Sequence, residues 1–396
     1  MNIGLFTDTY YSQVNGVITS MNMLRKELTE MGHEVFIFAC GSGAENNPDD
    51  ERIISFPSMS LSFLPNLRIS LVYPPKHLIK IRSCKLDIVH TQTEFPMGIL
   101  GKLVSEAARI PMVHTYHTMY EEYVHYVKGR MFTPQFAQTY SRVFCNRADI
   151  VIAPTEKTKA SLLDYGVLRP IEVVPTGIDF SPFSPELAPE NESDKLRESF
   201  NIPKDAPVVV FVGRLAREKS LDVTINAFAE LNKIIPSAKM LIVGTGPAED
   251  ELKALCADLN IAPHVIFAGV KKWCEIGAYY RLGDVFMTSS VTETQGLTYI
   301  EAIASGTVVV AKKDRSVDGL IDHGKTGFLF ENDRDAAQTL INAVSLSDKS
   351  AVAKAALNRI SGFSSRKFAQ SAEEIYNLAI ENNNTLKRAH GRNIIR

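Results

Sequence analysis

Short apolar runs alternate with helically periodic segments almost from one end of this chain to the other, and that alternation constrains its fold more than any other feature. Such runs are typical of buried parallel strands, which need a crossover helix between them. The first half carries them at 2–6, 35–40, 86–90, 111–116, 149–154 and 171–175. The second half carries them at 207–213, 239–244, 265–269, 284–288 and 307–311. We therefore expect an α/β protein whose strands form parallel sheets.

The helix expected after the first strand is the most regular one. Its apolar residues recur every three or four positions, as on one buried helix face: Ile18, Met21, Leu24, Leu28 and Met31. Gly32 follows and supplies a C-terminal stop.

The length of 396 residues exceeds what one ordinary core supports and suits two domains. A Ser- and Pro-containing stretch followed by charged, poorly periodic residues makes 180–206 the best linker candidate. We expect one Rossmann-like domain at 1–180 and a second at 181–364. The closing helical segment 365–396 has no strand after it, and we expect it to pack back on the first domain.

Charge and cysteine usage exclude several classes of function. A formal net charge of −2 gives no basic field for binding nucleic acid. The five cysteines are scattered without zinc-site spacing, which favours a reduced cytoplasmic setting. The first residues resemble a strand rather than a signal peptide, and no apolar run approaches the ~20 residues that span a bilayer.

Ligands of doubly wound sheets collect at the carboxyl ends of strands, so residues just after the predicted strands are the first candidates for function. Gly16, in Asn15-Gly16-Val17, precedes the first helix and lets backbone amides approach a diphosphate, although a plain tight turn needs a glycine too. Arg214 and Lys219 follow the strand at 207–213. Two cations at that position can neutralise a diphosphate. The alternative interpretation is that both are ordinary solvated surface residues.

The segment from Glu293 to Glu301 is the most informative, because it lies between a strand and an apolar helix. If Gly296 begins that helix, its free amides form an anion site, and Glu301 lies roughly 7 Å further along the helix at ~1.5 Å per residue. Two glutamates also suit a glycosidase, but that chemistry gives the phosphate-binding groups no role. An acidic helix start with an exposed helix glutamate is the structural alternative.

His117 follows the strand at 111–116 and could reach a sugar, although a lone histidine is more often structural. Two further motifs are discounted. Gly244 and Gly246 lack the third glycine of a dinucleotide loop, so a tight turn after a strand is expected. Asp333 and Asp335 have the spacing of a metal-binding pair, but acidic capping of a helix explains them.

Together these residues resemble the retaining GT-B glycosyltransferases of family 4, and the likeness covers nearly the whole chain. It is carried by Gly16, Arg214 with Lys219, Gly244 with Gly246, and Glu293 with Glu301. The family implies two Rossmann-like domains whose parallel sheets face each other across a cleft. It also implies that 1–180 binds the acceptor and 181–364 the nucleotide sugar.

In the second domain, the resemblance implies that Arg214 and Lys219 bind the donor diphosphate. Glu293 and Gln295, with the amides of Gly296 and Leu297, would hold the sugar and the phosphate.

The resemblance further implies that Glu301 binds the ribose, Gly16 admits the diphosphate and His117 contacts the sugar. The expected catalytic residues are Glu293, His117, Arg214 and Lys219. The family has no agreed protein nucleophile, and front-face attack assisted by the departing phosphate is expected. No cofactor or metal is obligatory, which leaves Mg²⁺ as a stimulant at most.

Within the family, the chain looks most like the bacterial diacylglycerol α-glucosyltransferases. The likeness includes Thr292 to Tyr299 and the run Tyr116-His117-Thr118, followed by Tyr120, Tyr123, His125 and Tyr126. Such enzymes transfer glucose from UDP-glucose to the 3-hydroxyl of diacylglycerol at the cytoplasmic leaflet. The helically spaced tyrosines favour core packing, with the acceptor entrance as the alternative.

The segment 58–86 gives independent support, because it mixes cations and apolar residues and contains no Asp or Glu. Cations near an anionic membrane contribute ~1 kcal/mol each, and apolar side chains can enter the headgroup boundary. A basic surface loop is the alternative, and the prolines argue against a single amphipathic helix. The expected membrane-docking residues are Arg68, Lys76, Lys80, Arg82 and Lys85.

Two rival functions stay open. One is a transferase of the same fold with a soluble sugar or polysaccharide acceptor, and the other is a nucleotide-sugar epimerase. The acid-free basic segment favours the lipid acceptor. The identity of the hexose, a second sugar addition and the oligomeric state are not determined by the sequence.

Overall fold

The computed structural model describes residues 1–9, 16–41, 50–61, 64–70, 73–122 and 133–393. The chain divides into two compact units, one comprising Met1–Gly177 with Ser365–Arg396 and the other Ile178–Ser364. Each unit has its own parallel sheet and its own core, and each is described by itself below.

Within the described residues, the sheet of the first unit has seven parallel strands in the order β3-β2-β1-β6-β7-β8-β9. A separate antiparallel hairpin pairs β4 with β5. The strands are β1 (Asn2–Thr7), β2 (Glu34–Gly41), β3 (Ile53–Pro57), β4 (Met59–Leu61), β5 (Leu64–Ile69), β6 (Ile88–Thr91), β7 (Met112–Thr115), β8 (Ile150–Ala153) and β9 (Ile171–Val173). The helices are α1 (Gly16–Glu30), α2 (Pro75–Ser83), α3 (Pro96–Ala108), α4 (Pro134–Cys145), α5 (Glu156–Asp164) and α13 (Ser365–Asn393), with a 3-10 turn η1 (Tyr120–Glu122).

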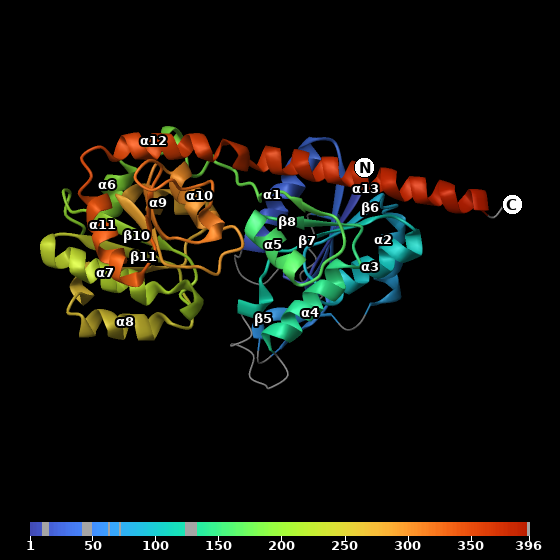
Figure 1. Cartoon of the computed structure of the whole chain (residues 1–396), viewed down its shortest axis with the longest axis horizontal. Coiled ribbons are helices and arrows are strands. Elements are labelled where there is room, and N and C mark those ends of the chain that lie inside the picture. The colour runs from blue at the N-terminus through green and yellow to red at the C-terminus, as the bar shows by residue number, and fades with distance from the viewer. Residues whose placement is uncertain (10–15, 42–49, 62–63, 71–72, 123–132, 394–396) are drawn as a thin grey trace. The chain divides into compact units, whose positions relative to one another are not determined.

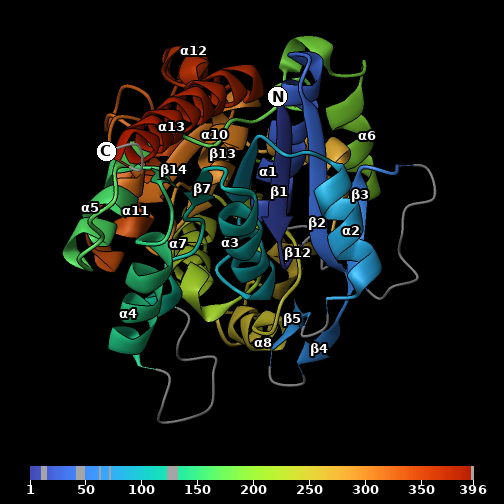
Figure 2. The same cartoon turned by 90° about the vertical axis from the view of Figure 1, so that its right-hand side faces the viewer.

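Two layers of helices cover this sheet. The face toward α1 and α13 buries alternate strand residues such as Ile3 and Leu5 against Met21 and Tyr376. The other face packs against α3, α4 and α5, and Figure 2 shows α3 beside β1 and β7.

The closing helix α13 belongs to the first unit and runs beside α1 (Figure 1). Its first residue is fixed because the Ser365 hydroxyl donates to the buried Glu27 carboxylate at 2.6 Å. Further along, the Tyr376 hydroxyl lies 2.7 Å from Nδ1 of the buried His90. The C-terminal segment therefore completes the first core instead of extending the second.

The second unit has a six-stranded parallel sheet within the described residues, in the order β12-β11-β10-β13-β14-β15. Its strands are β10 (Val208–Val212), β11 (Lys239–Val243), β12 (Val265–Gly269), β13 (Val285–Thr288), β14 (Val308–Lys312) and β15 (Phe328–Phe330). Its helices are α6 (Glu192–Ser199), α7 (Leu221–Ile234), α8 (Glu249–Asp258), α9 (Ile276–Leu282), α10 (Leu297–Ala304), α11 (Ala336–Val344) and α12 (Lys349–Arg359). Its 3-10 turns are η3 (Pro185–Leu187), η4 (Arg217–Lys219), η5 (Ala262–His264), η6 (Trp273–Glu275), η7 (Arg315–Val317), η8 (Asp333–Asp335) and η9 (Ser361–Phe363).

The core of the second unit lies on both faces of its sheet. Helices α7, α8 and α11 pack on one face, and α9, α10 and α12 pack on the other. All five residues of β10 are buried, as expected of a central parallel strand.

The eleven strand ranges predicted from sequence all overlap strands of the structure, and α1 ends before Gly32, which has a φ of 90°. The prediction missed β3, the hairpin β4-β5 and β15, because such short strands carry little periodic signal. The stretch 180–206 is not a linker. Phe183 and Ile202 are buried in the core of the second unit, and the Arg281 guanidinium on α9 pairs with Glu192 at 2.6 Å.

None of the described helices combines the length and the apolar character that crossing a bilayer requires.

Candidate functional site

The sheet order of the second unit brings two loops together at its carboxyl edge. The chain runs outward from β10 through β11 to β12 and then returns to β13, which pairs directly with β10. The crossovers after β10 and β13 therefore leave in opposite directions, and such a switch point is where doubly wound sheets bind ligands. Arg214 and Lys219 follow β10, and Glu293 to Leu297 follow β13.

Lys219 and Glu293 meet at this switch point although 74 residues separate them in the chain. The Lys219 ammonium donates to Oε1 of Glu293 at 2.5 Å, and both side chains are 19% exposed. A second link lies beside the pair, where the Thr292 hydroxyl donates to the Glu218 carbonyl at 3.3 Å. The structure thus joins two groups that the sequence only suggested separately.

Arg214 is the more accessible cation. Its guanidinium lies 3.9 Å from the Glu218 carboxylate, and its side chain is 45% exposed, against 3% for Glu218. Arg217 differs from both cations, because it is 76% exposed and pairs with Glu251 of α8 at 3.2 Å. The site therefore offers an anion the accessible guanidinium of Arg214 and the largely buried ammonium of Lys219.

Gly244 and Gly246, which the sequence predicts to form a tight turn, support the loop that carries Arg214. A Cβ on Gly244 would lie 1.9 Å from the Gly213 carbonyl oxygen, and one on Gly246 would lie 2.1 Å from that of Leu215. The Leu215 amide donates to the Thr245 carbonyl at 3.0 Å. Only glycine permits this backbone approach, so the tight turn is real and also holds the β10 loop.

Helix α10 begins at Leu297, directly after Gly296. Gly296 has a φ of 72°, and a Cβ there would lie 2.3 Å from the ring of the fully buried Tyr299. The first amides of a helix have no intrahelical acceptor and carry the positive end of its dipole. This helix start lies at the same switch point as the Lys219–Glu293 pair, with Gln295 buried between them along the chain.

Glu301 lies in the first turns of α10 and is buried, with only 8% exposure. The Tyr280 hydroxyl on α9 donates to its Oε2 at 2.9 Å. Burial raises the pKa of the Glu301 carboxyl to about 7, and the hydrogen bond from Tyr280 offsets part of the rise. The alternative of an exposed helix glutamate is therefore wrong for this residue.

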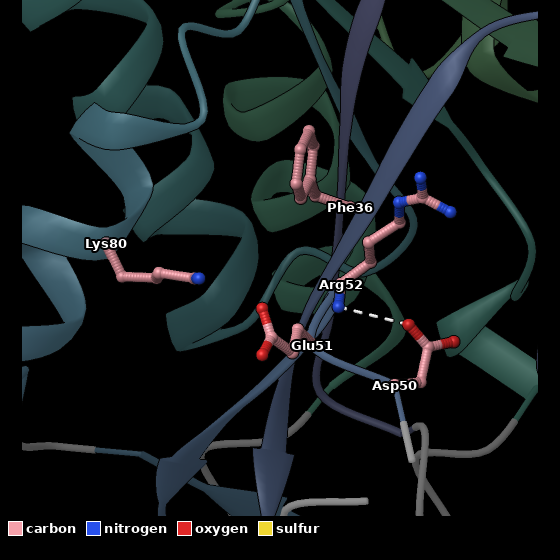
Figure 3. Close-up of a pocket in the computed structure, with 5 residues that line it drawn as sticks. All are labelled: Phe36, Asp50, Glu51, Arg52 and Lys80. Atoms are coloured by element: carbon pink, nitrogen blue, oxygen red, sulfur yellow. Dashed lines mark hydrogen bonds between the residues drawn. The ribbon is translucent and has the colours of Figure 1, made fainter. Parts of the chain in front are cut away.

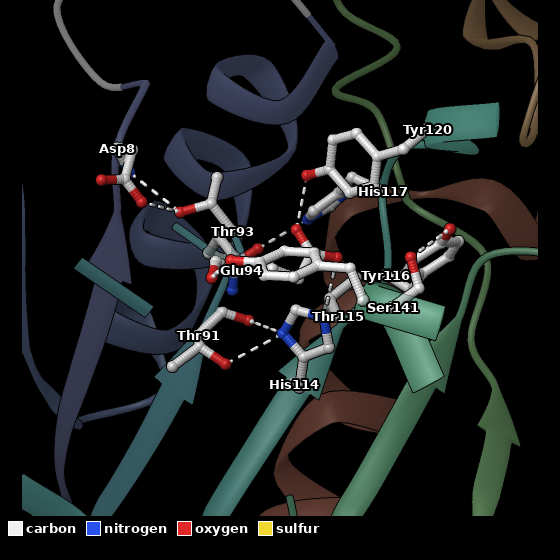
Figure 4. Close-up of polar contacts among 12 residues, drawn as sticks. Asp8, Thr91, Thr93, Glu94, His114, Thr115, Tyr116, His117, Tyr120 and Ser141 are labelled. Carbon is white, nitrogen blue, oxygen red and sulfur yellow. Dashed lines mark hydrogen bonds and ion pairs between the residues drawn. The ribbon is translucent and has the colours of Figure 1, made fainter. Parts of the chain in front are cut away.

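The first unit has its own switch point between β1 and β6, and buried polar side chains fill it. Asp8 follows β1, and its carboxylate accepts from the Thr93 hydroxyl at 2.6 Å (Figure 4). It also accepts from the Met97 amide at 3.1 Å. Burial raises the pKa of Asp8 to about 6 in spite of these hydrogen bonds. Asp8 ties the end of β1 to the start of α3.

Glu94 is the centre of a second buried group. Its carboxylate is 3.2 Å from Nε2 of His114 and accepts from the Tyr120 hydroxyl at 2.5 Å, while its carbonyl accepts from the Tyr140 hydroxyl at 2.6 Å. Figure 4 shows Glu94, His114 and Tyr120 gathered at the ends of the strands. These contacts fix the backbone on both sides of His117.

His117 follows β7 and is partly buried, and its Nε2 lies 2.7 Å from Oε1 of Gln92. Burial lowers the pKa of His117 to about 3, and neighbouring His114 adds to the effect. The preceding Tyr116 is fully buried, with its hydroxyl 3.1 Å from that of Ser141.

The sequence pattern did not single out Asp8, Gln92, Thr93 and Glu94, although all four directly follow strands. The rule that picked out His117 could have found them, because Gln92 to Glu94 come immediately after β6. Among the tyrosines at helical spacing, Tyr116 and Tyr120 are packed side chains, and η1 is a 3-10 turn rather than an α-helix. Tyr123, His125 and Tyr126 lie outside the described residues.

Gly16 is the first residue of α1, and the Asn15 before it lies outside the described residues. Arg68 belongs to β5, whose side chains are not described. The other predicted docking residues, Lys76, Lys80, Arg82 and Lys85, are exposed on or just after α2. Leu78 and Ile79 lie among them at 41% and 70% exposure.

A pocket of about 430 Å³ lies beside α2 in the first unit (Figure 3). It is lined by Phe36, Asp50, Glu51, Arg52 and Lys80. Phe36 lies near the start of β2, and residues 50–52 precede β3, so the pocket belongs to the amino edge of the sheet. Its mixture of two carboxylates and two cations does not suit a diphosphate.

The helix-capping interpretation of Asp333 and Asp335 is wrong in detail. Asp335 precedes α11 but makes no capping hydrogen bond with its side chain, and Asp333 pairs with Lys312 at 2.7 Å. Among the described residues, no cluster of three or more His, Cys, Asp or Glu side chains could hold a metal ion.

Two family profiles match the chain. Residues 14–181 match Glycosyltransferase Family 4, and residues 192–356 match Glycosyl transferases group 1. The first match covers most of the first unit, and the second lies within the second unit.

Two curated proteins are similar over nearly the whole chain. The alpha-monoglucosyldiacylglycerol synthase of Streptococcus pneumoniae is 36% identical, with 98% of this chain and 88% of that protein covered. The protein of the same name from Acholeplasma laidlawii is 30% identical, with 97% and 98% covered.

Solved glycosyltransferase structures share the fold. Anabaena Alr3699/HepE in complex with UDP-glucose has a TM-score of 0.75 at 20% identity, covering 94% of this chain and 98% of that one. WaaG, a glycosyltransferase involved in lipopolysaccharide biosynthesis, has a TM-score of 0.70 at 17% identity, covering 94% and 99%.

Proposed function

The chain belongs to glycosyltransferase family 4 and is a hexosyltransferase of the GT-B fold, and from that premise we propose its donor, acceptor and place of action. It transfers glucose from UDP-glucose to the 3-hydroxyl of 1,2-diacylglycerol with retention, making α-monoglucosyldiacylglycerol at the inner face of the cell membrane. The Lys219–Glu293 pair beside the start of α10 is the observation that carries the proposal for the donor. The names of the two curated relatives support the acceptor.

The switch point of the second unit suits a nucleoside diphosphate sugar. Arg214 and Lys219 neutralise the diphosphate, and the amides of Gly296 and Leu297 donate to its oxygens. The Glu301 carboxylate accepts hydrogen bonds from the ribose hydroxyls, because its two oxygens can accept from two neighbouring hydroxyl groups.

Glu293 is already paired with Lys219, and binding of the donor separates the pair, because the diphosphate and the sugar each take one of the two side chains. The ammonium turns toward the diphosphate, and the carboxylate, assisted by Gln295, binds sugar hydroxyls. As the bond from the sugar to the phosphate breaks, negative charge grows on the leaving diphosphate, and Arg214 and Lys219 stabilise it. No protein nucleophile is required when the acceptor hydroxyl attacks from the face of the departing phosphate and passes its proton to an oxygen of that phosphate as the sugar–phosphate bond breaks.

The first unit contributes Gly16, which leaves room for the diphosphate at the start of α1, and His117, which contacts the sugar. Its helix α2 supplies the membrane contact, because cations and the exposed Leu78 and Ile79 share one short helix. Each cation near an anionic surface contributes ~1 kcal/mol, so the four at Lys76, Lys80, Arg82 and Lys85 give reversible docking.

Substitutions at the switch point test the donor assignment. We expect Glu293→Ala to abolish transfer and Lys219→Ala to lower kcat/KM for UDP-glucose severely, with both proteins folded. Arg217→Ala is the matched control. Arg217 is a cation of the same loop, but it pairs with Glu251 and not with Glu293. Wild-type turnover in both Glu293→Ala and Lys219→Ala would refute the site.

A product screen tests the acceptor. Nucleotide sugars are offered with diacylglycerol in mixed micelles, and products are identified by mass and anomeric coupling. An α-glucosyl lipid is expected. Transfer only to soluble sugars would replace the lipid acceptor, and conversion of the donor without any acceptor would mean an epimerase.

Neutralising Lys76, Lys80, Arg82 and Lys85 together to glutamine tests the membrane contact. Activity on anionic liposomes should fall far more than activity on detergent-dispersed diacylglycerol. The matched control neutralises four exposed lysines of the second unit, Lys195, Lys204, Lys325 and Lys354. Equal losses in both formats, or an equal loss in the control, would argue against docking through α2.

A further inference from the structure

Gln92 holds one ring nitrogen of His117. Nε2 of His117 lies 2.7 Å from Oε1 of Gln92, whose side chain is buried with 2% of the residue exposed. An amide carbonyl oxygen can only accept hydrogen bonds, so Nε2 must carry the proton in this contact. Gln92 itself is fixed, because its backbone amide donates to the Phe6 carbonyl at 2.8 Å.

The other ring nitrogen of His117 is then an acceptor. Burial lowers the pKa of His117 to about 3, so the ring is neutral at physiological pH. A neutral imidazole has one N–H, and Nε2 already has it. Nδ1 therefore presents an unshared electron pair and can bind only a hydrogen-bond donor.

The two neighbouring histidines differ from His117 in this respect. His90 has Tyr376 on one ring nitrogen and Thr115 on the other, and His114 has Thr91 and Glu94. Both rings are satisfied within the protein and are structural. For His117, the described residues supply a partner to Nε2 and none to Nδ1.

The amide group of Gln92 also has an unsatisfied end. Its Nε2 is buried and finds no hydrogen-bond partner among the described residues. Burying an amide donor without an acceptor costs free energy that an apolar side chain of the same length would avoid. That cost is understandable if the carbonyl end is needed to hold His117 in one tautomer.

We propose that Gln92 is a positioning residue that fixes the Nε2–H tautomer of His117 and thereby makes Nδ1 the acceptor for a hydroxyl group of the transferred sugar. The inference rests on the proposed function, in which His117 contacts the donor sugar. It adds a rule of recognition: the group facing Nδ1 must donate a hydrogen bond, so a hydroxyl is accepted and an acceptor-only substituent is rejected.

The tautomer is measured directly by ¹⁵N NMR of the histidine-labelled full chain without substrate. The chain has nine histidines, and the spectrum of His117→Asn assigns the resonance of interest. Wild-type protein should show protonated Nε2 and unprotonated Nδ1. Gln92→Met should lose this preference, whereas Gln92→Glu should keep it, because a carboxylate oxygen accepts the same proton.

A wild-type ring with its proton on Nδ1, or an unchanged tautomer in a folded Gln92→Met, overturns the proposal. This measurement uses no donor or acceptor, so its failure is distinct from a failure of the proposed function.

The recognition rule is tested with UDP-glucose analogues in which fluorine replaces one sugar hydroxyl at a time, because fluorine cannot donate a hydrogen bond. One analogue should lose at least tenfold more kcat/KM than its neighbours with wild-type enzyme. Gln92→Met should reduce that difference, and Gln92→Glu should restore it. Gln338→Met, on the exposed side of α11, is the control for a glutamine change elsewhere. An analogue profile identical in wild type and Gln92→Met overturns the rule.

Discussion

Glu301→Gln should make the second unit more stable at alkaline pH and change it little in acid. The Glu301 carboxyl is 8% exposed, and burial raises its pKa from 4.5 to about 7. Glutamine has nearly the same shape, and its amide oxygen can accept the hydrogen bond that Tyr280 donates to Oε2 at 2.9 Å. The substitution therefore removes the cost of a buried charge and keeps the Tyr280 contact, while the Trp273 indole loses the charged partner that it favours.

The size of the effect follows from proton binding. Below pH 4.5 the carboxyl is protonated in both the folded and the unfolded chain, so it has no effect on stability. Between pH 4.5 and 7 the unfolded chain releases a proton that the folded chain retains, so the free energy of unfolding falls as pH rises. A difference of roughly 2.5 pKa units corresponds to about 3 kcal/mol, which is fully expressed above pH 7.

The single tryptophan of the chain, Trp273, makes the assay specific. It lies in the second unit and packs against Phe183 with ring centroids 5.5 Å apart, so its fluorescence reports the unfolding of the unit that contains Glu301. Urea unfolding at pH 4.5 and pH 8 gives the difference between variant and wild type. We expect a difference near zero at pH 4.5 and a gain of up to about 3 kcal/mol at pH 8.

An equal difference at both pH values would refute the reasoning, because no proton would then be linked to Glu301. A loss of stability at pH 8 would show that the carboxylate is better satisfied than its burial implies.

Three further outcomes are expected. In wild-type enzyme, KM for UDP-glucose should fall as pH rises from 6 to 8, because ionised Glu301 accepts ribose hydroxyls better than the neutral acid; a profile unchanged in Glu301→Gln would contradict this. Gly246→Ala should destabilise the second unit by roughly 1–3 kcal/mol in Trp273 fluorescence, because a Cβ would meet the Leu215 carbonyl at 2.1 Å, whereas Gly362→Ala, with nothing within 4 Å, should be nearly neutral. Thr93→Val should lower the protection of β1 against hydrogen exchange by about 2 kcal/mol, and the loss should be larger at pH 8 than at pH 5. Equal losses at the two pH values would exclude a link to the Asp8 carboxylate, which accepts the Thr93 hydroxyl.

The proposed site illustrates how far local sequence patterns reach. Arg214, Lys219 and Glu293 could be named because each follows a predicted strand, and parallel strands end at one edge of a sheet. That Lys219 and Glu293 touch could not be read from the pattern, because it requires β13 to pair with β10 rather than with β12. Strand order depends on the packing of whole crossovers and leaves no mark in a short window of sequence.

Burial was the second quantity beyond the reach of the sequence. Glu301 occupies a helix start where exposed glutamates are common, and only the packing of α9 over α10 removes it from water and brings Tyr280 to its carboxylate. The glycines at 244 and 246 follow the same logic. Their spacing predicts a turn, but the Leu215 carbonyl oxygen that would lie 2.1 Å from a Cβ on Gly246 belongs to another loop.

The sequence by itself determined the α/β class and the positions of most strands, and it pointed to the loops in which we propose the site, because apolar periodicity and glycine placement act over a few neighbouring residues. The tertiary structure decided which of those loops meet, which carboxyls lose their water and which nitrogen of His117 carries the proton. These properties arise from contacts between segments far apart in the chain, such as Gln92 with His117 or Lys219 with Glu293, and each contact exists only once the sheet of its own unit has formed.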